Sequence, residues 1–169
     1  KQPFAAQPLE RLPLFLAQWQ GICRRGQDVD DLRTALERLF GYCAPAELWE
    51  SEFLPARLRP YHQPWLDNVL QNSDLRWYGC GERRIGFAFS DMIGLFQHRD
   101  VPANDAEIAA LSPAWATPAG VDARYDFSAL QRLSGLPSSE LTARLWSLTW
   151  RGRLANDAMS AVRQGVLND

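Results

Sequence analysis

The chain has 169 residues and a formal net charge of −2, with 46% of its residues hydrophobic and 22% charged. This composition is typical of a globular protein with one core or two small ones, and the acidic balance excludes a protein that coats nucleic acid by bulk positive charge. No apolar run approaches the roughly 20 residues of a membrane-spanning helix and the first residues lack a signal-peptide pattern, so we expect a cytoplasmic protein with no membrane partner.

Residues 1–26 are expected to form an N-terminal segment that packs against the next part of the chain. Three prolines disfavour regular helix before Pro13, and apolar residues then recur at helical spacing up to Ile22. Trp19 belongs to that apolar pattern and is predicted to be a core residue. In an alternative interpretation, Gln18 and Gln20 read a nucleobase on either side of a stacking Trp19 ring.

Residues 27–100 predict a first winged-helix-like unit. Asp28 or Asp30 can cap a helix, and Pro45 and Pro64 can each stand in the first turn of another. Residues 75–78 and 85–89 then predict two strands joined by a turn that carries two arginines. The connector 56–59, between two prolines, is expected to be exposed. Three helices followed by a hairpin is the winged-helix order.

The second half of the chain predicts a linker and a second unit. Pro113, Pro118 and Gly120 make residues 112–124 linker-like, and we place the linker region at 101–125. Residues 126–169 then predict a winged-helix or helix-turn-helix unit, with a turn at Gly135, a helix from Ser138 that Gly152 ends, a short strand, and a helix capped by Asn156. The expected fold is mainly α with small β wings, in two tandem winged-helix-like units.

Residues that could carry catalysis or bind metal are sparse. His62 and His98 are isolated from each other and from the cysteines, and Lys1 is the only lysine, so neither a zinc spacing nor a phosphate-binding loop is present. Cys23, Cys43 and Cys80 are odd in number and widely spaced, which favours reduced core thiols over a disulfide framework. We predict no catalytic residue, no metal site and no cofactor in this chain.

Several stretches together carry a family resemblance. These stretches are Trp19-Gln20-Gly21, Trp49-Glu50, Leu-Pro-Ala-Arg at 54–57, Tyr61, Pro-Trp-Leu-Asp at 64–67, Trp77-x-Gly79, and Leu-Trp-x-Leu-x-Trp-x-Gly-x-x-x-Asn-Asp at 145–157. With them the chain resembles the C-terminal region of the large helicase-related (Lhr) superfamily-2 DNA helicases. The resemblance implies a winged-helix tail of an ATP-driven motor that acts in DNA repair. ATP and Mg²⁺ are implied for the motor only, whose motifs are absent here.

The predicted function is that of a non-motor segment which binds single-stranded or branched DNA. Arginines on the connector, the wing tip and the second unit are the candidate phosphate contacts, because a guanidinium can grip phosphate with two donors. They are Arg57, Arg59, Arg83, Arg84, Arg144, Arg151 and Arg153. A module that docks on the motor region or assembles into a homo-oligomer is the alternative, and part of a DNA glycosylase-like tail is the second alternative.

Overall fold

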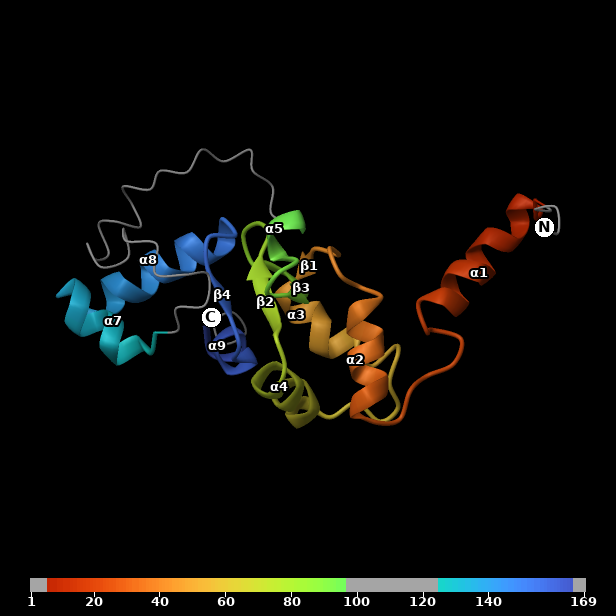
Figure 1. Ribbon diagram of the computed structural model, residues 1–169, viewed down its shortest axis with the longest axis horizontal. Coiled ribbons are helices and arrows are strands. Elements are labelled where there is room, and N and C mark those ends of the chain that lie inside the picture. The colour runs from red at the N-terminus through yellow and green to blue at the C-terminus, as the bar shows by residue number, and fades with distance from the viewer. Residues whose placement is uncertain (1–5, 97–124, 166–169) are drawn as a thin grey trace.

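The computed structural model describes residues 6–96 and 125–165 (Figure 1). At its centre is an antiparallel four-stranded sheet in the order β1-β3-β2-β4. The hairpin of β2 (Leu75–Gly79) and β3 (Arg84–Phe89) forms the middle of the sheet. The two-residue strands β1 (Ala44–Pro45) and β4 (Ala155–Asn156) form its edges. In Figure 1, α2 and α3 lie on one side of this sheet, and α7 and α8 on the other.

The helices before the hairpin confirm the predicted winged-helix order. The Asp28 side chain caps α2 (Val29–Glu37) by accepting from the Asp31 N–H at 2.9 Å, and Gly41 turns the chain with a φ of +76°. The short α3 (Ala46–Leu48) continues into a π-helical turn, η2 (Trp49–Phe53). Pro64 lies in the first turn of α4 (Gln63–Asn72), and α5 (Ile93–Phe96) follows the hairpin.

The main core lies between these helices and the sheet. Trp49 is fully buried at its centre: the indole N–H donates to the Ile85 carbonyl at 3.1 Å, and the ring meets Phe87 edge to face with centroids 4.7 Å apart. Leucines of α2 and α4 fill the space around it, and burying each such side chain contributes about 1.5–3 kcal/mol. They are Leu32, Leu36, Leu66 and Leu70.

The C-terminal segment joins the same sheet and core. Its elements are α7 (Phe127–Ser134), α8 (Ser138–Trp150), β4 and α9 (Met159–Gly165). β4 pairs with β2, and Met159 and Val162 of α9 are fully buried in the main core. The strand predicted as a second wing therefore completes the first sheet, and two separate winged-helix units are not shown. The predicted linker lies outside the described residues, apart from Tyr125.

The N-terminal helix does not pack as predicted. η1 (Leu9–Arg11) and α1 (Leu12–Trp19) bury no residue, and α1 extends away from the sheet in Figure 1. Trp19 is 61% exposed, so the prediction that it is a core residue is wrong. The physical reason is that the apolar residues of α1 follow one another around the helix, so that helical spacing alone does not specify a single buried face.

The cysteines also differ from the prediction. Cys43 and Cys80 form a disulfide with their Cα atoms 6.1 Å apart, and Cys23 is exposed. Cys43 precedes β1 and Cys80 follows β2, and the β1-β3-β2 order brings these two positions together across β3. A sequence separation of 37 residues gave no sign of that pairing. No helix among the described residues is long and apolar enough to cross a bilayer.

Candidate nucleic-acid interface

Arg57 is not available to DNA. It is only 6% exposed, and its guanidinium donates to the Phe53 carbonyl at 2.9 Å and to Gln20 Oε1 at 3.1 Å. Burial lowers the pKa of Arg57. The connector predicted to be exposed is folded inward here, since Leu58 is buried too. The predicted DNA contact at Arg57 is therefore corrected to a structural role, in which the side chain joins the end of η2 to the segment after α1.

The wing turn presents Arg83 and Arg84 to solvent. Both side chains are exposed, and Arg84 Nη2 donates to the Cys43 carbonyl at 2.7 Å. Arg83 has a φ of +53°, and its carbonyl accepts from the Ala46 N–H at 2.8 Å. The side-chain bond of Arg84 and the backbone bond of Arg83 together fix the direction of the turn. Glu82 between Gly81 and Arg83 is also exposed, so the tip carries charges of both signs.

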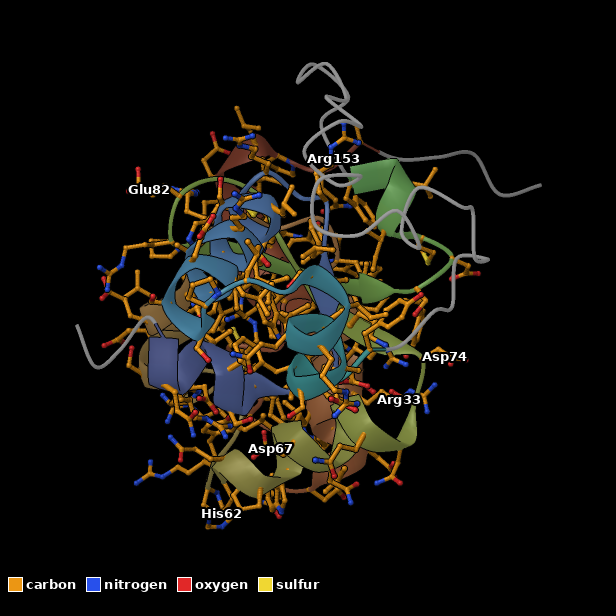
Figure 2. The ribbon with its side chains drawn as sticks, turned by 90° about the vertical axis from the view of Figure 1, so that its left-hand side faces the viewer. Arg33, His62, Asp67, Asp74, Glu82 and Arg153 are labelled. Carbon is orange, nitrogen blue, oxygen red and sulfur yellow. A yellow bond between two sulfur atoms is a disulfide. The ribbon has the colours of Figure 1, made fainter. Side chains whose placement is uncertain are left out.

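The end of α8 meets the wing turn. The Gly81 N–H donates to the Trp150 carbonyl at 2.9 Å. A hollow of about 720 Å³ lies between the wing turn and the end of α8 with the turn that follows it. Its lining includes Glu82, Arg151 and Gly152. Figure 2 shows Glu82 and Arg153 toward the same end of the molecule, away from His62 and Asp67. We call Arg83, Arg84, Arg151 and Arg153, all of them exposed, the wing-end surface.

The two remaining candidates, Arg144 and Arg59, make contacts with other parts of the chain. Arg144 pairs with Glu140 one turn earlier on α8, at 2.6 Å, in an exposed ion pair. The Arg59 N–H donates to the Gly26 carbonyl at 2.8 Å, so that residue lies beside the segment between α1 and α2. Of the seven predicted residues, four lie on the wing turn and the turn after α8, which the bond from Gly81 to Trp150 joins.

A buried ionic cluster was missed by sequence reasoning. Arg163 of α9 makes two bonds to Glu50, at 2.7 and 2.8 Å, and its Nη1 lies 2.8 Å from Asp67 Oδ2. The Tyr61 hydroxyl donates to Glu50 at 2.6 Å, and burial together with that bond raises the Tyr61 pKa above its usual range. Because two hydrogen bonds to Glu50 of η2 and the ion pair to Asp67 of α4 tie Arg163 to these earlier elements, this cluster holds α9 in place. Arg163 and Glu50 are 113 positions apart, and no pattern in the sequence indicates that they pair.

Comparison with known proteins shows which protein family the first part of the chain matches. Residues 8–90 match the winged-helix domain of the large helicase-related protein. That range runs from the residue before η1 to the residue after β3, and so contains the elements from η1 to the β2–β3 hairpin. The chain carries a large helicase-related winged-helix domain. The domain's wing is the β2–β3 hairpin, and β4 and α9 complete its sheet and core from beyond the matched range.

Two curated relatives extend the similarity to most of the chain. A Lhr helicase/probable uracil glycosylase of Mycolicibacterium smegmatis is 28% identical over 159 residues, which is 88% of this chain. A Lhr helicase/uracil glycosylase of Escherichia coli is 29% identical over 150 residues, or 81% of this chain. Each alignment covers 10% of the relative, so the chain spans about a tenth of the length of these proteins. The chain is thus a distant homologue of one segment of them.

Proposed function

We propose that this chain is an accessory, non-motor segment of an ATP-dependent DNA helicase and contacts DNA through the wing-end surface. The observation that supports the proposal is the hydrogen bond between the wing turn and the end of α8, because these two adjoining turns carry four exposed arginines on a net acidic protein. Guanidinium groups grip phosphate oxygens with paired donors and carry no sequence preference by themselves. Such a surface suits contact with the sugar-phosphate backbone of single-stranded or branched DNA.

The whole protein would supply the rest of the activity. In this proposal ATP and Mg²⁺ bind the motor region of the same cytoplasmic polypeptide, this chain holds no cofactor, and the complete enzyme acts in DNA repair. Base excision stays an alternative for the whole protein, since both relatives carry uracil glycosylase in their names. We assign it no catalytic side chain among residues 6–96 and 125–165.

Removing the charge of the wing tip tests the proposal. Changing Arg83 and Arg84 together to glutamine should weaken binding of a fluorescent single-stranded oligonucleotide roughly tenfold at constant salt, because charge-assisted contacts to phosphate are lost. The salt dependence of log K should also become shallower, by about 0.7 for each phosphate contact removed. Fluorescence anisotropy measures both quantities.

The control for this experiment is Arg33, which lies at the opposite end of β3 from the wing turn, with its guanidinium 5.8 Å from the centre of the Phe89 ring. Arg33 of α2 is exposed and pairs with Glu37, so Arg33→Gln removes a similar charge from another surface. Equal affinity of the wild type and the double variant, or equal weakening by Arg33→Gln, would contradict a DNA site at the wing end.

A second candidate function is protein docking, and α1 favours it. Large apolar side chains of η1, α1 and the turn after it are exposed: Leu9, Leu12, Leu14, Phe15, Leu16, Trp19 and Ile22. An unburied apolar helix of this kind is typical of an interface with protein. If α1 drives self-assembly, light scattering should show an oligomer that Phe15→Ser with Trp19→Ser converts to a monomer. A wild-type monomer would leave the motor region as the docking partner of this alternative.

A further inference from the structure

A second hollow opens on the face formed by α7, α8, β4 and α9, the face toward the viewer in Figure 2. Its volume is about 480 Å³, within the range of roughly 300–1,000 Å³ typical of small-ligand pockets. We propose that this pocket takes one unstacked nucleobase of a DNA strand whose backbone lies on the wing-end surface. The inference rests on the proposed DNA binding and adds to it a base-binding site.

The walls of the pocket are aromatic. Tyr125 and Phe127, at the start of α7, are each 41% exposed, and Trp77 and Trp146 line the pocket from β2 and α8. Trp146 is held in place by stacking on Trp150, with ring centroids 4.8 Å apart. Trp77 is buried at the back of the pocket, while the exposed rings of Tyr125 and Phe127 offer the flat apolar surfaces that a nucleobase face needs for stacking.

The polar groups of the pocket are neutral. Asn156 Oδ1 accepts from the Ala158 N–H at 2.7 Å, which orients the amide and leaves its NH₂ group to donate elsewhere. Gln164 adds an exposed amide and Thr142 a hydroxyl. None of the described residues that line the pocket is charged. A flat, uncharged ligand with donors and acceptors along its edge fits this lining, whereas a phosphate finds no cation inside it.

The cation that would bind a phosphate of the DNA strand lies just outside the pocket. Arg153 is exposed, and the next residue, Leu154, lines the pocket. In Figure 2, Arg153 lies above the ribbons of α7 and α8, toward the same end of the molecule as Glu82. A strand held by its phosphate at Arg153 therefore passes the mouth of the pocket, where a base turned inward meets Phe127. Charge outside and aromatic rings inside is the arrangement by which proteins hold single strands without reading their sequence.

The test compares strands with and without bases. The wild-type chain should bind a short oligothymidylate about tenfold more tightly than an oligomer of the same length built from abasic residues. Phe127→Ala should remove most of that ratio and leave affinity for the abasic oligomer unchanged. Leu133→Ala is the matched control, because Leu133 lies on the same helix, is 48% exposed and does not line the pocket. The Leu133→Ala variant should keep the full ratio of its affinity for oligothymidylate to its affinity for the abasic oligomer.

A second variant guards against a folding effect. Gln164→Ala removes only an exposed amide and should reduce the ratio about threefold, as expected for one lost hydrogen bond. Equal affinity of the wild type for both oligomers would overturn the base site while leaving phosphate binding intact, and would point to a protein segment as the occupant. Equal loss in the Leu133 variant would also overturn it. Binding to neither oligomer would overturn the proposed function itself.

Discussion

Replacing Arg163 by alanine is expected to lower the free energy of unfolding by about 3 kcal/mol, at the low end of the cost of removing one partner from a buried ion pair. The reason is the environment of Glu50, whose side chain is 8% exposed and would keep a charge with no guanidinium beside it. Asp67 is 31% exposed and would regain water, so it adds less. Urea denaturation followed by tryptophan fluorescence measures the change.

Two further variants separate the buried charge from the contact itself. Arg144→Ala breaks an exposed pair on α8 and should cost no more than about 1 kcal/mol. Adding Glu50→Gln to Arg163→Ala should recover part of the loss, because the uncompensated carboxylate is then gone. A loss at Arg163 no larger than at Arg144 would show that the cluster does not fix α9. Amide exchange should report the same change locally, with α9 opening before the central strands.

The sequence predicted the local elements because their signals are local. The predicted side-chain cap at Asp28 begins α2, and the predicted turns at Gly135 and Gly152 are glycines in the left-handed region that follow α7 and α8. Each of these features depends on a few neighbouring residues, so it can be found without knowing the fold. The resemblance to the large helicase-related family was likewise confirmed, since its motifs are contiguous.

The assembly of these elements could not be predicted in the same way. β4 has two residues, too few to show a period, yet its pairing with β2 turns the expected second wing into part of the first sheet. Arg57 was expected to be exposed because prolines flank its connector, but its partner Gln20 lies 37 residues away. Of the candidate site, the wing-tip arginines followed from the hairpin pattern. The contact of the wing turn with the end of α8, which places Arg151 and Arg153 on the adjoining turn, depended on long-range pairing.

Replacing Gly79 by alanine is expected to destabilise the protein strongly, although it adds only one methyl group. A Cβ atom there would overlap the Thr149 carbonyl oxygen and lie 2.5 Å from the Thr149 carbonyl carbon. Both are backbone atoms, so no side chain can rotate aside. The end of β2 and the end of α8 must then separate, at a cost of about 3 kcal/mol or more, the upper end of ordinary overpacking.

Gly94→Ala is the matched control, because an added Cβ at Gly94 meets nothing within 4 Å and Gly94 lies in α5. Alanine there should be neutral or stabilise by up to about 1 kcal/mol. Urea denaturation compares the two variants, and limited proteolysis should cut the Gly79 variant near the end of α8 first. Equal stability of the two variants would contradict the close approach of β2 and α8.

The Gly79 variant also distinguishes two forms of the DNA-binding proposal. The hydrogen bond from Gly81 to Trp150 lies next to the contact that the methyl group disrupts, and it joins the wing turn to the turn carrying Arg151 and Arg153. If all four arginines act as one surface, Gly79→Ala should weaken DNA binding and should add little to the loss already caused by Arg83→Gln with Arg84→Gln, because coupled groups are not additive. Full additivity at a temperature where both variants are folded would instead mean that the wing binds DNA without α8.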